Sequence, residues 1–245
     1  MSQDDLDRIL AESGTIIKGH FVLNSHLHTE TYVNKWELYK DPYRYLDPFC
    51  RDIMEHFTDY EPIFSQIDWI VGPAVGGIPM CTLLQYIMAE QTELIGMQTG
   101  MKYKDIFAAY AVKDFVNDEL KIQKSYHEDI RDKNVLVVDD VVSSGLSIKA
   151  VINEVRALGG KVLAAACLFN RAAQTTRSLG VPTFYSCLDE LIVDWEESSC
   201  PLCAKQVPID TNVGHGAEFL KKKEIGKEAS KIPQPDSKPF DISIF

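Results

Sequence analysis

The segment at residues 135–147, VLVVDDVVSSGLS, constrains the fold of this chain more than any other part of the sequence. Its first four residues form a continuous apolar run of the kind found in a strand that is covered on both faces. Asp139 and Asp140 follow this run directly, and open α/β sheets bind ligands at the carboxyl ends of their strands. The segment therefore predicts a buried parallel strand that ends in a ligand-binding site.

A loop of small residues follows the two carboxylates and opens a helix that we predict over residues 148–158. Backbone N–H groups and hydroxyls at the start of a helix suit a phosphate dianion, although serines also serve there as ordinary helix caps. Two adjacent carboxylates repel each other unless a cation or hydroxyl groups lie between them. This order of groups favours a site for a phosphorylated sugar. Its phosphate-binding residues would be Ser143, Ser144, Gly145, Leu146 and Ser147.

A second loop, rich in glycine, lies between a short apolar strand predicted at residues 68–71 and a helix predicted at residues 80–89. Its sequence, GPAVGGIP, lets the backbone approach an anion closely and point successive N–H groups toward it. A tight turn without a ligand is the alternative. The residues predicted to bind the anion are Ala74, Val75, Gly76 and Gly77.

Strands and helices alternate along the rest of the chain, as they do in parallel α/β sheets. We predict helices at residues 4–13 and 47–57, two short strands within residues 19–35 joined by a polar turn at residues 24–28, and later strands at residues 160–169 and 181–186. Proline and lysine dominate after Phe219, so residues 220–245 are expected to form an extended or disordered tail.

The composition limits the classes of protein to which the chain can belong. With 245 residues, 45% of them hydrophobic, it can bury one sizeable core. The net charge of −11 argues against nucleic acid as a partner. No secretory signal and no apolar run long enough to cross a bilayer is visible, so we expect a cytoplasmic protein without a membrane partner. Its six cysteines are then expected to be reduced thiols.

Residues 135–147 are similar to the diphosphoribosyl-binding signature of type I phosphoribosyltransferases, with SSGLS where threonines are common. The resemblance extends over roughly residues 14–215. It implies an α/β fold with a central, mainly parallel sheet flanked by helices and a small hood contributed by both ends of the chain. It also implies a single domain at residues 1–219, with an N-terminal hood segment (1–40), a core (60–195) and a C-terminal CxxC segment (196–219).

Two further segments resemble orotate phosphoribosyltransferases in particular. GPAVGGI is similar to the loop that contacts pyrophosphate in these enzymes, and GHFVLNSHLHTETYVNK is similar to the segment that covers the base, with His26 in place of a glycine. The resemblance implies base-binding roles for His28, Thr29, Tyr32 and Arg171. A guanidinium group offers a fork that pairs with the carboxylate and carbonyl oxygens that orotate carries. Without the resemblance, we would interpret the histidines as surface residues of a hairpin.

The reaction implied by this resemblance displaces pyrophosphate from C1 of phosphoribosyl diphosphate by a ring nitrogen of orotate, giving orotidine 5'-monophosphate. The catalytic residues would be Asp139, Asp140 and Lys113, with Lys121 and Lys124 as further candidates in a cationic loop. Mg²⁺ is the implied cofactor, held by the substrate and in part by the two carboxylates. In this family the cationic loop reaches into the neighbouring subunit, which implies a homodimer.

Two other functions remain open at this point. A purine phosphoribosyltransferase would need an aromatic residue that stacks on the base, for which Tyr185 and Trp195 are candidates. A regulator that senses phosphoribosyl diphosphate without turnover usually carries a DNA-binding region or a basic face, and this sequence shows neither. The cluster of lysines followed by a His-Gly pair that is usual in the cationic loop of these enzymes is not recognisable at residues 109–124. This departure is the one feature that favours lost catalysis.

Cys200 and Cys203 form a CxxC pattern, and His215 stands twelve residues beyond the second cysteine. This spacing permits a zinc ligand set. Structural zinc normally has four protein ligands and no second CxxC follows, so Cys187 would have to supply the fourth. Ligand counting favours a turn with two ordinary thiols over this zinc site.

Overall fold

The computed structural model describes residues 1–60, 63–100, 104–114 and 119–229. The chain divides into two compact units. Unit 1 comprises Met1–Ile17 and Val33–Ile192, and unit 2 comprises Lys18–Tyr32 and the chain from Val193 on.

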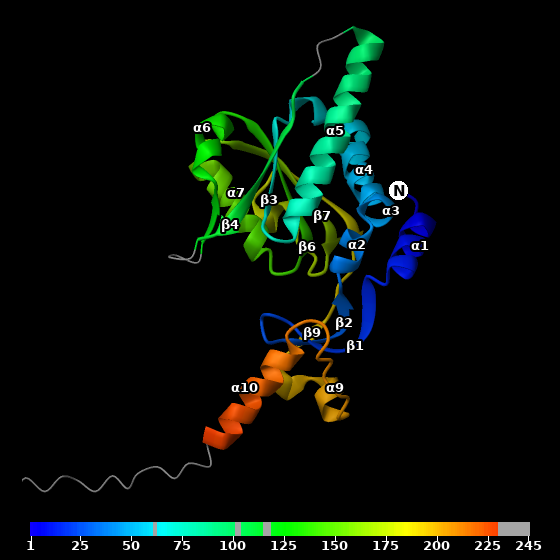
Figure 1. Ribbon diagram of the computed structural model, residues 1–245, viewed down its shortest axis with the longest axis vertical. Coiled ribbons are helices and arrows are strands. Elements are labelled where there is room, and N and C mark those ends of the chain that lie inside the picture. Colours follow the sequence, from blue (N-terminus) through cyan, green and yellow to red (C-terminus); the bar gives the residue numbers. More distant parts are fainter. Residues whose placement is uncertain (61–62, 101–103, 115–118, 230–245) are drawn as a thin grey trace, which may run out of the picture. The chain divides into compact units, whose positions relative to one another are not determined.

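Unit 1 is built on a six-stranded sheet with the strand order β5-β4-β3-β6-β7-β8 (Figure 1). All neighbouring strands are parallel except β4 and β5, which form an antiparallel pair. The strands are β3 (Trp69–Pro73), β4 (Phe107–Lys113), β5 (Leu120–Ile122), β6 (Asn134–Val142), β7 (Lys161–Asn170) and β8 (Thr183–Asp189). The predicted α/β fold with a mainly parallel sheet is confirmed.

The helices of unit 1 connect and cover these strands. They are α1 (Gln3–Ser13), α2 (Trp36–Lys40), α3 (Pro42–Tyr45), α4 (Asp47–Glu55), α5 (Gly77–Thr99), α6 (His127–Ile130), α7 (Leu146–Ala157) and α8 (Thr176–Leu179), with short η1 (His56–Tyr60), η2 (Phe64–Gln66) and η3 (Lys124–Tyr126). Among the described residues, no helix combines the length and the apolar character needed to cross a membrane.

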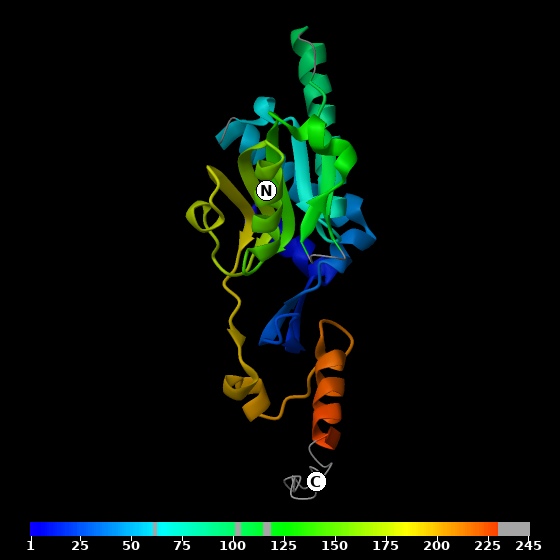
Figure 2. The same ribbon diagram turned by 90° about the vertical axis from the view of Figure 1, so that its left-hand side faces the viewer.

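Helix α5 is much longer than the helix predicted at residues 80–89, and its last turns extend beyond the sheet (Figures 1 and 2). The apolar pattern fades after Ala89, but the glutamines and glutamates that follow are good helix formers. The helix ends only at Gly100, which adopts a left-handed conformation with φ of 70°.

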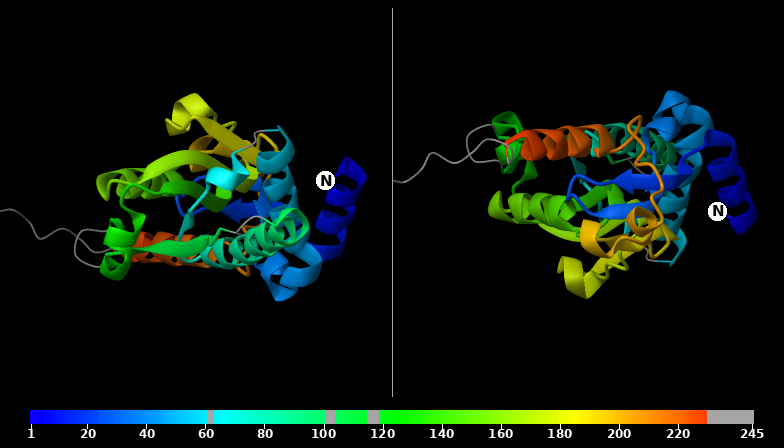
Figure 3. Two further views of the ribbon diagram at one scale, coloured as in Figure 1. Left: turned by 90° about the horizontal axis from the view of Figure 1, so that it is seen from above. Right: turned by 90° about the horizontal axis from the view of Figure 1, so that it is seen from below.

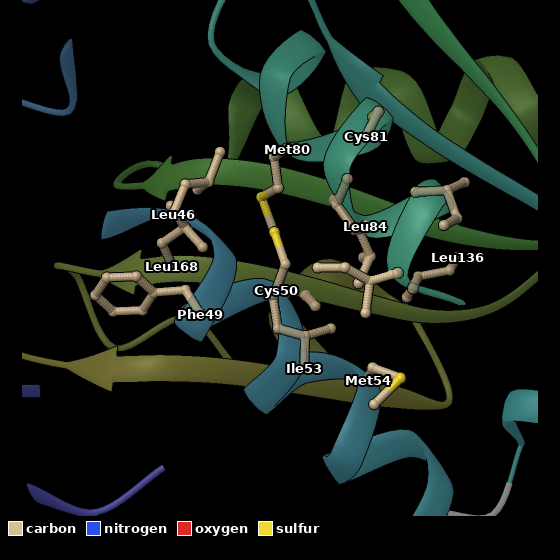
Figure 4. Close-up of a cluster of buried hydrophobic side chains, with 14 of the residues drawn as sticks. Leu46, Phe49, Cys50, Ile53, Met54, Met80, Cys81, Leu84, Leu136 and Leu168 are labelled. Atoms are coloured by element: carbon tan, nitrogen blue, oxygen red, sulfur yellow. The ribbon is translucent and has the colours of Figure 1, made fainter. Parts of the chain in front are cut away.

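Two hydrophobic cores lie on opposite faces of the sheet because side chains alternate along each strand. Leu136 and Val138 of β6 belong to the first core, which α4 and α5 cover (Figure 4), whereas Val135 and Val137 belong to the second, which α7 covers. Helix α1 lies beside α3 and α4 (Figure 3), where Glu12 accepts a 2.6 Å hydrogen bond from Arg44. The two cores explain why β6 reads as an uninterrupted apolar run in the sequence.

Unit 2 contains a small three-stranded sheet with the order β1-β2-β9. Strands β1 (Ile16–Val22) and β2 (His28–Val33) form the predicted hairpin, and β9 (Asp194–Trp195) pairs antiparallel with β2. The outer ends of β1 and β2 belong to unit 1, because the division falls after Ile17 and after Tyr32. The chain continues through η4 (Glu197–Ser199), α9 (Pro201–Ala204) and α10 (Gly216–Ala229).

Helix α10 differs from the extended tail predicted to begin at residue 220, since the chain is helical to Ala229. The segment is rich in lysine, glutamate and alanine, which favour a helix although they bury little surface. The rest of the predicted tail, residues 230–245, lies outside the described residues.

The turn between β1 and β2 places His26 in the left-handed region, with φ of 66°. Within the turn, the Leu23 N–H donates to Leu27 O at 2.9 Å and the His26 N–H donates to Leu23 O at 2.9 Å. Histidine therefore adopts here the backbone conformation that the family pattern assigns to glycine.

We predict that His26→Gly is more stable than His26→Ala by about 1 kcal/mol, because only glycine enters the left-handed region without a steric cost. Urea unfolding and the hydrogen exchange of the Leu23 amide, which the turn protects, would measure the difference. The alanine variant serves as the control because both changes remove the imidazole. Equal stability of the two variants would contradict the strain assigned to this turn.

Candidate active site

The two glycine-containing loops meet at one edge of the sheet because the strands before them are parallel neighbours. Trp69 of β3 pairs with Val135 of β6, so the β3–α5 loop and the β6–α7 loop both leave the sheet at its carboxyl edge. The N-caps of α5 and α7 are Gly76 and Gly145, and neither contributes a side-chain cap. Two sets of backbone N–H groups at helix N-termini are therefore available to anionic groups.

The two carboxylates lie within β6, although the sequence analysis expected them just after the strand. The strand continues because its pairing with β7 continues, from Asp139 opposite Cys167 to Val142 opposite Asn170. Asp139 and Asp140 are consequently buried, with 6% and 1% of their surface exposed. Isolated carboxylates are rarely buried to this extent unless they have charged or hydrogen-bonding partners.

Asp140 finds its partners in Lys35 and Tyr39, which the sequence analysis did not name as site residues, although Lys35 ends the segment at residues 19–35 that resembles the base-covering segment. The Lys35 ammonium group, which precedes α2, lies 2.8 Å from Oδ2 of Asp140. The Tyr39 hydroxyl lies 2.8 Å from the same oxygen and 2.7 Å from the Gly76 carbonyl oxygen. The i, i+4 spacing of Lys35 and Tyr39 at the start of a short helix is the only local signal that could have indicated them.

Gly76 is required by the close approach of the first loop to the acidic pair. A methyl group at this position would lie 1.9 Å from Oδ2 of Asp140 and 2.5 Å from Nζ of Lys35. The loop at residues 72–77, the carboxylates of β6 and Lys35 therefore form one contiguous site. The predicted diphosphate loop and the two carboxylates predicted to be catalytic therefore meet here.

Lys35 also attracts the Asp139 carboxylate, but among the described residues no cation forms an ion pair with it. Burial raises the pKa of Asp139 well above its usual range, and the negative charge of Asp140 raises it further. Its Oδ1 accepts a 2.9 Å hydrogen bond from the Asp140 backbone N–H. The site thus holds one carboxylate that is balanced by Lys35 and another that gains from a proton, a cation or donated hydroxyl groups.

The loop at residues 143–147, which the sequence predicts to bind phosphate, is held in place by residues outside it. Gln174 donates to the Ser143 carbonyl oxygen at 3.0 Å, and Gly145 adopts φ of 76°. The Leu146 N–H has only a long 3.4 Å contact with the Ser144 hydroxyl. The loop is therefore shaped before a ligand binds.

A pocket of about 620 Å³ adjoins this loop, and two of the three candidate lysines line it. Lys113 and Lys121 line it together with Leu146 and Ser147, whereas Lys124 does not. Lys121 lies 3.1 Å from both Glu119 and Glu154, so its charge is already balanced. Lys113 is exposed at the end of β4 and lines this pocket, so it stays a candidate for contact with an incoming anion.

The predicted base-binding residues fall into both units. Arg171 directly follows β7 in unit 1 and is 6% exposed. In unit 2, Tyr32 is half-buried, whereas His28 and Thr29 are fully buried. The Thr29 hydroxyl donates within unit 2 to the carbonyl oxygens of Thr31 and Val193. The base-binding roles of these residues stay a prediction.

The two aromatic residues considered for stacking on a purine have other neighbours. The Tyr185 ring stacks on His56 with centroids 3.9 Å apart, and its hydroxyl donates to Asp52 at 2.6 Å. Trp195 lies in β9, in register with His28. At least one face of the Tyr185 ring is thus already covered.

Comparison with known proteins identifies the family of the chain. Residues 49–205 match the family described as phosphoribosyl transferase domain, and the chain belongs to that family. It is 32% identical to an orotate phosphoribosyltransferase of Caldanaerobacter subterraneus subsp. tengcongensis, an alignment that covers 85% of this chain and 96% of the relative. A Thermoanaerobacter orotate phosphoribosyltransferase is 31% identical over the same shares.

Solved structures support the fold. The crystal structure of Mycobacterium tuberculosis orotate phosphoribosyltransferase superposes with a TM-score of 0.55 at 18% identity, covering 76% of this chain and 96% of that one. The corresponding enzyme of Aeropyrum pernix gives a TM-score of 0.54 at 21% identity, covering 74% of this chain and 93% of that one.

We predict that Asp139→Asn flattens the pH dependence of stability. Between the ordinary aspartate pKa and the raised pKa of folded Asp139, the folded state binds more protons than the unfolded state, so the unfolding free energy falls as pH rises. Asparagine does not titrate, so the unfolding free energy of the variant should rise relative to that of the wild type as pH increases from about 4 to about 8. Urea unfolding at each pH measures this difference. Asp129→Asn, at an exposed position, is the control, and parallel curves for the Asp139 variant and the wild type would refute the assignment.

Proposed function

We propose that this phosphoribosyltransferase acts on orotate, transferring the phosphoribosyl group of phosphoribosyl diphosphate to a ring nitrogen of the base. The products are orotidine 5'-monophosphate and pyrophosphate. One observation carries the proposal. The adjacent parallel strands β3 and β6 each lead into a helix whose N-terminus has no side-chain cap, and β6 carries a buried pair of carboxylates between them. The curated relatives named orotate phosphoribosyltransferase support the choice of orotate.

The geometry matches the charges that the reaction creates. The bond between C1 and the diphosphate oxygen breaks as the bond from C1 to the base nitrogen forms, so positive charge develops on the ribose and negative charge on the leaving group. Asp139 and Asp140 would accept hydrogen bonds from the ribose hydroxyls and stabilise the positive charge. The N-terminus of α7 would hold the 5-phosphate, and the loop before α5 would hold the diphosphate.

Lys35 extends this assignment to a residue that lies at the end of the segment resembling the base-covering segment but was not itself predicted to bind the substrate. Its ammonium group lies against Gly76 in the diphosphate loop and is held there by Asp140. The side chain remains 29% exposed, so it can contact an incoming diphosphate without leaving the loop. We therefore assign Lys35 to neutralising the charge of the bound diphosphate. Lys113 is assigned to stabilising the same group as it leaves, from the β4 side of the site.

The donor set also fits magnesium, which prefers carboxylate oxygens. Burial and the charge of Asp140 raise the pKa of Asp139 more than the charge of Lys35 lowers it, so a divalent ion would relieve the repulsion between the two side chains. Asp139 and Asp140 would hold the ion directly or through the ribose hydroxyls. When bound, it supplies positive charge to the diphosphate.

The first test is turnover of orotate, followed by the loss of its absorbance, with magnesium and phosphoribosyl diphosphate. We expect Asp139→Asn, Asp140→Asn to lose at least about 100-fold in kcat/KM, as is usual when electrostatic stabilisation of a transition state is removed. Asp129→Asn should match the wild type. Turnover of purine bases but not of orotate would refute the choice of base, and binding of phosphoribosyl diphosphate without turnover would indicate a sensor.

Lys113 also provides a test of the homodimer, which we infer from family membership. If this residue acts in the neighbouring subunit, co-expression of Lys113→Ala with the double aspartate variant should restore activity, since each mixed dimer contains one complete site. Random pairing would give about a quarter of the wild-type activity. Each variant alone should be inactive. Mixed dimers that form but remain inactive would place Lys113 in the site of its own subunit.

A further inference from the structure

Four side chains with metal-binding atoms gather in unit 2. The proposed phosphoribosyl transfer assigns no role to this cluster. His20 comes from β1, His28 from the start of β2, and Cys200 and Cys203 from the segment around α9. Their candidate ligand atoms all lie within 4.8 Å of one another. His20 is 2% exposed, His28 0% and Cys200 2%.

The distances among these atoms match the edges of a zinc tetrahedron. Zn–S bonds of about 2.3 Å and Zn–N bonds of about 2.0–2.1 Å place sulfur and nitrogen about 3.6 Å apart across a tetrahedral edge. Nε2 of His20 lies 3.7 Å from Sγ of Cys200 and 3.7 Å from Sγ of Cys203, and Nδ1 of His28 lies 3.4 Å from Sγ of Cys203. The two nitrogens are 2.8 Å apart and would separate by about 0.5 Å around an ion.

The other ring nitrogen of His20 is already committed. Nδ1 lies 2.7 Å from the Val207 carbonyl oxygen, to which it can only donate, so Nε2 carries a lone pair directed into the cluster. Metal-bound histidines are usually oriented in this way by a backbone carbonyl group. A divalent ion with two thiolates and two neutral imidazoles has no net charge, as a buried site requires.

Unit 2 also lacks the hydrophobic core that would otherwise stabilise it. Neither of the two core clusters contains one of its residues, and its buried hydrophobic residues among those described are Phe21, Val22 and Cys200. Units with so little buried apolar surface usually depend on a metal or on disulfides. All the cysteines are free thiols in the structure.

We propose that His20, His28, Cys200 and Cys203 bind one structural zinc ion that joins the β1–β2 hairpin to the segment after β9. Four protein ligands complete a tetrahedron and leave no position for a substrate, which distinguishes a structural site from a catalytic one. Two imidazoles and two thiolates in a tetrahedron select zinc over harder ions such as magnesium.

This ligand set differs from the one that the sequence spacing permits. His215 is not part of the cluster, and its Nδ1 lies 3.0 Å from Glu218 in the first turn of α10. Cys187 lies in β8 of unit 1 and is not part of the cluster either. His28, for which the family resemblance implies a base-binding role, is instead a metal ligand in this proposal.

The test begins with the metal content of the full chain purified without added metal, measured by mass spectrometry. We expect one zinc per chain. His20→Ala, His28→Ala, Cys200→Ser and Cys203→Ser should each bind less than half of this, whereas His215→Ala should retain it. His215 is the matched control because the sequence pattern alone would select it as the third ligand.

Cobalt substitution tests the same site in the unaltered chain and avoids variants that fail to fold. Co²⁺ should give the intense visible bands of a tetrahedral ion and the near-ultraviolet absorption of two thiolate ligands, and zinc should abolish both. Chelation should speed hydrogen exchange in the β1–β2 hairpin while the amides of β6 stay protected. A chain without stoichiometric zinc, a Cys200–Cys203 disulfide in the reduced preparation, octahedral cobalt spectra, or loss of zinc in His215→Ala would each overturn the proposal.

Discussion

The parallel pairing of β3 with β6 is the constraint on which the rest of unit 1 depends. Each strand is followed by a loop and a helix, and pairing brings the two loops to the same edge of the sheet. Because β6 is buried on both faces, a shift in its register would move charged residues into a hydrophobic core. The same apolar packing that fixes this register therefore fixes the distance between the two loops that we propose to bind anions.

This arrangement buries Asp139 and Asp140, and burial of a carboxylate is unfavourable unless charged or hydrogen-bonding groups compensate it. Neighbouring side chains compensate Asp140 more fully than Asp139. Lys35 and Tyr39 balance Asp140, while Asp139 keeps a raised pKa because burial and its neighbour disfavour the charged form. A ligand that brings hydroxyl groups and a divalent ion supplies what the second carboxylate lacks. Binding of the substrate and stability of the fold are thus coupled at one pair of side chains.

Local patterns in the sequence predicted the strand, loop and helix units, because each is formed by residues that are close in the chain. The predictions failed where distant residues decide the outcome. Lys35 reaches Asp140 across 105 positions, and His20 reaches Cys200 across 180, so no spacing rule connects either pair. The spacing along the chain therefore offered His215 as a possible zinc ligand, whereas the two histidines that lie beside the cysteines come from β1 and β2.

Unit 2 is discontinuous, since its first part ends at Tyr32 and its second begins at Val193. During synthesis the hairpin therefore leaves the ribosome long before its partner segment exists. At translation rates of about 5–20 residues per second, this wait lasts on the order of 10–30 s, enough time for the intervening α/β sheet to begin folding as a unit. The order in which the chain is made thus separates the assembly of its two parts, and the smaller part is completed last.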